Sequence, residues 1–124
     1  MKKPTEFHSL DDLSQGIERR LADGLVTHIY PGEHAMLSIV DIQPNAAGPI
    51  HSHPQEQWGV MLSGSGVRTQ GGEKILVKGG DFWRTPPKVE HGFMAGSDGA
   101  RILDFFSPPR NEYENGGAGV GFEK

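Results

Sequence analysis

The sequence predicts an all-β domain, a sandwich or a barrel, on three observations. Eighteen glycines and nine prolines among 124 residues suit short strands joined by tight turns better than a helical bundle. Short segments rich in β-branched and aromatic residues recur along the chain, separated by turn signals. Hardly any stretch has the spacing of an amphipathic helix. At this length we expect one domain with a single hydrophobic core.

The first half of the chain is expected to supply three strands. Before them, Ser9 to Leu13 has the composition of one helical turn, with the Ser9 side chain as its N-cap. The segment 35–42 carries apolar residues on both of its faces, which suits a strand between two layers, and a buried helix is the alternative. The predicted strands are 25–30, 35–42 and 57–62.

Glycine-containing turns divide the second half of the chain. Hairpin turns are predicted at 63–66 and at Gly71-Gly72, and a further turn at 96–99. The strands expected around these turns are 67–70, 74–77, 82–84, 91–95 and 100–106.

The whole chain, 1–124, is expected to be one domain with three parts. These are an N-terminal arm (1–24), a barrel core (25–107) and a C-terminal tail (108–124). The glycine-rich stretch 115–121 of the tail is expected to be mobile unless it covers another part of the protein.

Charge and cysteine content exclude several classes of function. The net charge is -4 and there is no basic stripe, so binding to nucleic acid is not expected. There is no cysteine, so a bound metal would need nitrogen and oxygen ligands, and the chain fits a reducing compartment. No apolar run approaches 18 residues and the N-terminus has no signal core. We therefore expect a cytoplasmic protein with no membrane segment.

One short motif points to chemistry. His51 and His53 are separated by one residue, so in an extended strand both rings point to the same face. Gln57 follows four positions later with a carboxamide oxygen. Neutral imidazole suits zinc, copper, iron and nickel. By itself the pair fits two partly exposed histidines on a strand equally well. His8, His28 and His34 have no partner at a useful spacing, and we do not expect them to be ligands.

Two motifs in register resemble those of the cupins, over roughly residues 29–107. The first cupin motif is H-x-H, a short spacer, Glu, six residues and Gly, and it falls here on His51, His53, Gln57 and Gly64. The second is matched by Gly80, Pro86 and His91 at the correct spacing. The chain departs from the second motif at two positions, with Lys88 in place of Gly and Ala95 in place of Asn.

The resemblance implies a double-stranded β-helix, or jelly roll, with a metal site near the mouth of the barrel. The implied ligands are His51, His53, Gln57 and His91, holding one divalent transition metal (Ni, Zn, Fe or Mn). Gln57 stands where cupins usually have Glu, so every ligand is neutral and the site should attract anionic oxygen ligands. Glu56 would supply a carboxylate only if the register slipped by one residue.

A narrower resemblance is to the pectin-degradation cupins. It depends on the run His53-Pro-Gln-Glu-Gln57 and on the segment Asp104 to Arg110. That group converts unsaturated uronates to open-chain keto-uronates, and it implies that Asp104, Phe106 and Arg110 take part in catalysis.

The residues themselves agree in part with that implication. Asp104 and Phe106 share one face of a strand, which alternation allows to be the barrel interior. A carboxylate there would have a perturbed pKa, whereas the alternative is an edge aspartate bonded to a turn. Arg110 fits a bidentate clamp for a substrate carboxylate, or a surface ion pair. Candidate pocket walls are Trp58, Met61, Trp83 and Phe93.

The sequence therefore predicts a metal-binding enzyme that acts on a small, anionic, carboxylated sugar derivative. In this prediction Asp104 moves a proton during hydration or ring opening, and Arg110 holds the carboxylate. The alternatives are a metal-dependent small-molecule dioxygenase and a non-catalytic sugar- or metal-binding module. Small jelly rolls often dimerise through N-terminal strands, so a homodimer formed through 7–22 is also expected.

Overall fold

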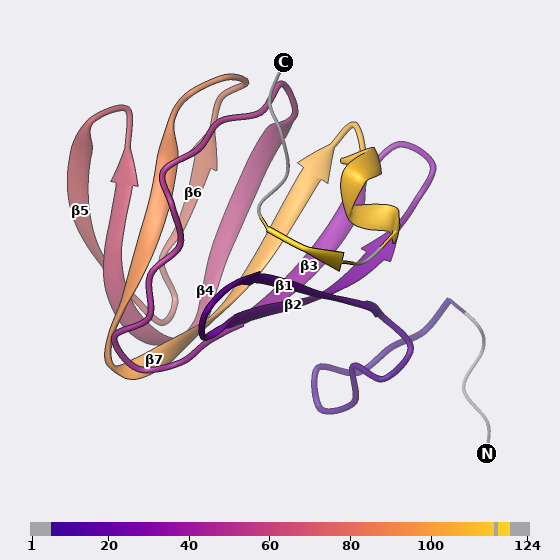
Figure 1. Ribbon diagram of the computed structural model, residues 1–124, viewed down its shortest axis with the longest axis horizontal. Helices are drawn as coiled ribbons and strands as arrows, with labels where there is room; N and C mark the ends of the chain where they lie inside the picture. The colour runs from indigo at the N-terminus through magenta and orange to yellow at the C-terminus, as the bar shows by residue number, and fades with distance from the viewer. Residues whose placement is uncertain (1–5, 116, 120–124) are drawn as a thin grey trace.

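The computed structural model describes residues 6–115 and 117–119, whose strands belong to one curled sheet (Figure 1). The sheet order is β5-β4-β7-β3-β2-β1-β8, and β6 pairs separately with β4. The elements are β1 (Ile17–Ala22), β2 (Leu25–Pro31), β3 (Met36–Ile42), β4 (Glu56–Gln70), β5 (Glu73–Lys78), β6 (Phe82–Thr85), β7 (His91–Ser107), the short 3₁₀ helix η1 (Asn111–Asn115) and β8 (Gly117–Ala118).

The all-β prediction is confirmed, and β2 and β3 match the strands predicted at 25–30 and 35–42. The predicted helical turn at Ser9 to Leu13 is wrong. That segment is a tight turn in which the Asp12 N–H donates to the Ser9 carbonyl at 3.1 Å and the Asp11 N–H to Ser9 Oγ. The serine side chain satisfies a backbone donor as a cap would, but no helix follows. Among the described residues, no helix is long and apolar enough to cross a bilayer.

Two predicted turns are instead irregularities inside long strands. β4 continues through 63–66, and Gly64 has a φ of +83° where its backbone crosses Gly99. β7 also continues through 96–99. On the neighbouring β4, Gly64 pairs with Ala100 and Gly66 with Ala95, so residues 96–99 of β7 lie opposite a single residue of β4. Extra residues opposite one partner residue are the signature of a bulge, which bends a strand without ending it.

The N-terminal arm contributes β1, which pairs antiparallel with β2 of the same chain. β8 of the C-terminal tail adds to the outer edge of β1 in parallel. Of the glycine-rich stretch predicted to be mobile, 116 and 120–121 lie outside the described residues. The division into arm, core and tail, the homodimer and the cytoplasmic location stay predictions.

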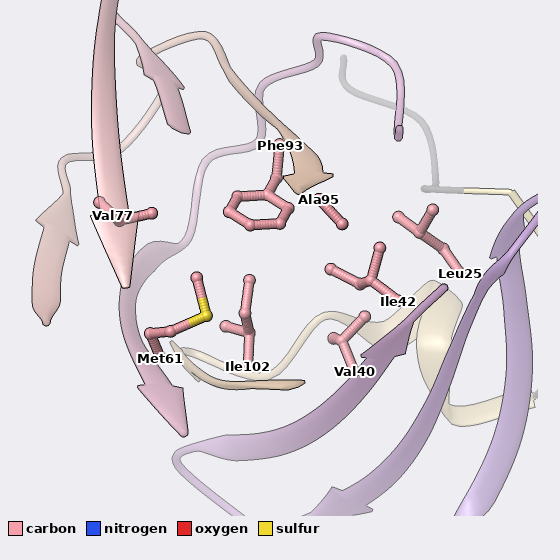
Figure 2. Close-up of a cluster of buried hydrophobic side chains, with 8 residues drawn as sticks. All are labelled: Leu25, Val40, Ile42, Met61, Val77, Phe93, Ala95 and Ile102. Atoms are coloured by element: carbon pink, nitrogen blue, oxygen red, sulfur yellow. The ribbon is translucent and has the colours of Figure 1, made fainter. Parts of the chain in front are cut away.

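The core has two clusters of buried side chains, with a cavity between them. In the larger cluster the side chains from β2, β3, β4, β5 and β7 point toward one another (Figure 2): Leu25, Val40, Ile42, Met61, Val77, Phe93, Ala95 and Ile102. The smaller consists of Ile29, Met36, Phe106 and Tyr113. Members of both clusters line the cavity, so apolar packing on either side fixes its walls.

Candidate metal centre

Three histidines lie together at the cavity. His51 lies in the loop between β3 and β4, and its backbone exchanges two hydrogen bonds of 3.0 and 2.9 Å with that of His91, the first residue of β7. This bridge brings residues forty positions apart side by side. His53 follows two residues later, and one ring nitrogen of each of the three histidines lies within 4.8 Å of the others. His53 and His91 are each only 2 % exposed.

Backbone carbonyls set the orientation of all three rings. His51 Nδ1 lies 3.1 Å from the Pro49 carbonyl oxygen, and His91 Nδ1 lies 2.9 Å from that of Val89. His53 Nδ1 is 3.1 Å from the carbonyl oxygen of Gln55. A carbonyl accepts only, so each Nδ1 carries the proton and each Nε2 keeps its lone pair. Metal-binding histidines are commonly held in this way.

The donor set fits a cation. His91 Nε2 is buried and has no hydrogen-bond partner within residues 6–115 and 117–119. His53 Nε2 lies 2.8 Å from Gln57 Oε1, so with Nδ1 protonated two electron-pair donors face each other. A cation between such groups removes their repulsion. The three histidines could therefore hold a metal ion, as the sequence predicted.

Asp104 fixes which end of the Gln57 carboxamide faces the histidines. Gln57 Nε2 donates to Asp104 Oδ1 at 3.0 Å, which leaves Oε1 turned toward His53. Gln57 is on β4, and Asp104 lies on the neighbouring β7 two residues before Phe106, the residue that pairs with Gln57. A carboxylate is an acceptor and selects the NH₂ end of the amide.

Burial and nearby charge perturb the titration of these groups. Burial lowers the pKa of His53 to about 4, and the Arg110 charge adds to the effect. Burial, with the Arg68 charge second, lowers the pKa of His91 to about 3. Burial also raises the pKa of Asp104 to about 6, although Arg68, Gln57 and Arg110 oppose the rise. Burial lowers the pKa of His51 too, so all three imidazoles are neutral at pH 7, the form that binds metal.

A column of stacked cations and rings runs from the histidines to β1. Phe106 meets the His53 ring edge-on at 5.5 Å. The buried Arg110 guanidinium carbon lies 5.4 and 4.2 Å from the ring centroids of Phe106 and Tyr113, which pack edge-on against each other at 6.0 Å. It also donates to Tyr113 Oη at 2.9 Å and lies 3.4 Å from Glu112. Two adjacent rings favour the buried guanidinium through cation–π attraction.

Arg19 ends the column and holds the C-terminal segment in place. It lies 4.9 Å from the Tyr113 ring centroid. It donates to the carbonyls of Glu112, Ala118 and Gly119 at 2.8, 2.9 and 2.8 Å. Carbonyl oxygens left free at a chain reversal are good partners for a guanidinium. Arg19 thereby makes η1, which carries Tyr113, part of the cavity wall.

Arg68 is a cavity residue that sequence reasoning missed. It lies on β4, is 6 % exposed and lines the cavity together with Asp104 and His91. Its Nη2 donates to Thr85 Oγ1 at 2.7 Å, and its Nε to Gln70 Oε1 at 3.3 Å. Strict alternation from Gln57 puts Val67 inside and Arg68 outside. The irregularity at 63–66 reverses that parity.

Comparison with known proteins agrees with this geometry. Residues 38–106, more than half of the chain, match the cupin domain family. The chain is a cupin. It is 27 % identical over 104 residues to the pectin degradation protein KdgF of Dickeya dadantii, covering 83 % of this chain and 88 % of KdgF.

Solved structures give the same fold. An RmlC-like cupin from Shewanella frigidimarina matches with a TM-score of 0.77 and 23 % identity, covering 91 % of this chain and 99 % of that one. KdgF from a Halomonas species matches with a TM-score of 0.71 and 26 % identity, covering 77 % and 88 %. Oxalate decarboxylase from Bacillus subtilis matches with a TM-score of 0.69 and 23 % identity, over 77 % of this cupin and 28 % of the decarboxylase.

The structure brings together most of the side chains singled out in the sequence. Asp104, Phe106 and Arg110 line the same cavity as His51, Gln57 and His91. The three histidines not expected to be ligands, His8, His28 and His34, lie outside the cluster.

The predictions for the pocket walls and for Glu56 had mixed outcomes. Phe93 lines the cavity, whereas Met61 is in the core and Trp83 lines a separate groove. Trp58 is 41 % exposed, because alternation along β4 turns it outward. Glu56 also faces outward, where it accepts from Trp58 Nε1 and lies 3.6 Å from Arg84. It is not part of the histidine cluster.

Proposed function

We propose that this cupin is a metal-dependent enzyme that converts an unsaturated uronate, released from pectin or alginate, to its open-chain keto-uronate. The observation that carries the proposal is the composition of the cavity. Neutral donors converge there, the carboxyl group of Asp104 lies beside them, and two guanidinium groups line the same walls. The similarity to KdgF supports this class of substrate.

The proposed ligands are His51, His53 and His91 through Nε2 and Gln57 through Oε1. The bound ion would be a divalent Ni, Zn, Fe or Mn, because sites with nitrogen and oxygen ligands accept all four. When bound, the ion supplies Lewis-acid polarisation of a substrate oxygen. None of the four ligands carries a negative charge, so an anionic ligand is favoured electrostatically.

Asp104 is the proposed proton carrier. The substrate is a cyclic enol ether with its double bond between C4 and C5 and a hemiacetal hydroxyl on C1. Ring opening breaks the bond between C1 and the ring oxygen, forms an aldehyde at C1 and releases an enol. The enol becomes a ketone when C4 gains a proton, so one proton moves from the C1 hydroxyl to C4 and no atom is lost. A carboxyl group with a pKa of about 6 can accept and return that proton near neutral pH.

Phe106 and Arg110 complete the proposed site. Phe106 is 2 % exposed and packs against His53, so it keeps water from one side of the histidine cluster. Arg110 adds a positive charge beside the cavity, and the resemblance assigns the substrate carboxylate to it. A buried cation attracts an anionic substrate more strongly than an exposed one, because solvent screens it less.

The direct test is the ultraviolet absorbance of the conjugated enol, followed with unsaturated galacturonate and unsaturated guluronate. Metal-loaded protein should abolish the absorbance faster than buffer, metal-free protein or free metal does. No acceleration with any of the four metals would refute the substrate assignment. Oxygen uptake by the iron-loaded protein would favour the dioxygenase alternative. Binding of the uronate without turnover would favour a non-catalytic module.

A further inference from the structure

Arg68 is a buried cation whose partners within the cavity are neutral. Its two hydrogen bonds go to a hydroxyl and a carboxamide oxygen, and its guanidinium carbon lies 5.4 Å from the Trp83 ring centroid. Within residues 6–115 and 117–119 it has no carboxylate within 4.0 Å, and Nη1 has no protein partner. Two of its five N–H donors are used.

Burying a guanidinium that has no carboxylate contact is costly, because water solvates the charge far better than a hydroxyl and an amide do. A hydrophobic residue of similar size would fill the same space between Trp83 and the cavity without that cost. An anionic ligand that takes up the free donors would offset it.

Arg110 is the obvious competitor for such a ligand, but a carboxylate already contacts its guanidinium. Phe106 and Tyr113 lie against it, and it contacts Tyr113 Oη and the carboxylate of Glu112. Its charge is already partly neutralised there. Arg68 has no carboxylate contact among the described residues, so a direct partner compensates its charge less than Glu112 compensates that of Arg110.

The position of Arg68 suits a ligand that also reaches the metal centre. It lines the cavity with His51, His91, Gln57 and Asp104, and Thr85, which holds it, pairs with Gln57 across β6 and β4. Its charge acts on both His91 and Asp104.

We propose that Arg68 binds the substrate carboxylate, and that Arg110 is a positioning residue held in the column of rings. This inference rests on the proposed function, since it takes the ligand to be a uronate. It assigns the specificity for an acidic sugar to a strand residue in the middle of β4 rather than to the end of the chain.

The test is the affinity ratio between galacturonate and its methyl ester, measured by calorimetry on the metal-loaded protein. Galacturonate lacks the C4–C5 double bond and is not turned over, and its methyl ester carries one added methyl group and no negative charge. The wild type should prefer the acid. Arg68→Gln and Arg68→Met should each reduce the ratio about tenfold to hundredfold, the size expected for a charge-assisted hydrogen bond. Arg110→Gln should retain it, and so should the control Arg84→Gln, because Arg84 is exposed and lies outside the cavity.

A ratio that is unchanged in the Arg68 variants, or lost in Arg110→Gln, would overturn the inference, as would equal binding of acid and ester by the wild type. If neither Arg68 variant folds, the Arg110→Gln ratio decides: retention supports Arg68, and loss assigns the carboxylate to Arg110. Turnover of unsaturated uronates tests the proposed function separately. A wild type with turnover but no preference for the acid would refute only the role of Arg68.

Discussion

Tyr113 is predicted to stabilise the cavity wall through its hydroxyl and through its ring. The guanidinium carbons of Arg19 and Arg110 lie 4.9 and 4.2 Å from the centroid of its ring, and its hydroxyl accepts from Arg110 at 2.9 Å. Tyr113→Phe removes one acceptor for a charged donor, which should cost about 2 kcal/mol. Tyr113→Leu also removes two cation–π contacts, each worth about 0.5–2 kcal/mol, so its total cost should be about 4 kcal/mol.

Equilibrium unfolding in urea at pH 7.5 measures both costs. Tyr30→Phe is the matched control, because Tyr30 has no guanidinium against its ring, and it should cost no more than about 1 kcal/mol. Equal stability of Tyr113→Phe and wild type would refute the hydroxyl contact. Equal stability of Tyr113→Leu and Tyr113→Phe would refute the stacked column, and with it the view that η1 forms part of the cavity wall.

Three other predictions concern the metal and the acid. Zn²⁺ or Ni²⁺ at 100 times its Kd should raise the unfolding free energy by about 2.7 kcal/mol. His91→Gln should abolish that gain. The control His28→Gln, which lies outside the cluster, should keep it. The metal-free protein should lose stability as the pH falls from 6.5 toward 4. Folded His53 and His91, with pKa values of about 4 and 3, stay neutral there while the unfolded chain takes up protons. Folded Asp104, with its pKa raised to about 6, takes up a proton below pH 6 and so opposes this loss of stability. The unfolding free energy, measured at pH 7.5 and 5.0, should therefore fall more steeply in Asp104→Asn than in the wild type. A shallower fall would contradict the assignment. Asp104→Asn should lower turnover about 10²- to 10⁴-fold and leave the stabilisation by metal intact. Unchanged turnover would show that Asp104 is not the proton carrier.

The composition and two spaced motifs were sufficient to predict the fold class and the cluster of histidines. Turn residues and β-branched segments act locally, so β2 and β3 could be placed without tertiary information. The convergence of His91 with His51 and His53 came from the motif spacing, because nothing local indicates a contact across forty residues. Alternation predicted that Asp104 and Phe106 share a strand face and allowed that face to be the interior, and both line the cavity.

What the sequence did not predict depends on long-range pairing. Glycines at 63–66 and 96–99 look like hairpin turns, yet the neighbouring strands keep β4 and β7 extended through them. The same irregularity turns Arg68 inward, against the alternation that starts at Gln57. Tyr113 and Arg19 were missed for another reason. Their positions depend on the C-terminal segment folding back onto β1, which no local pattern indicates.

The measurement that tests the central claim most directly is anomalous diffraction from crystals of the metal-loaded protein with galacturonate bound. The account predicts one metal peak about 2.0–2.2 Å from Nε2 of His51, His53 and His91 and from Gln57 Oε1, with the sugar carboxylate against Arg68. A metal bound away from these four atoms would contradict the proposed centre. So would a Gln57 side chain that turns its nitrogen toward the ion.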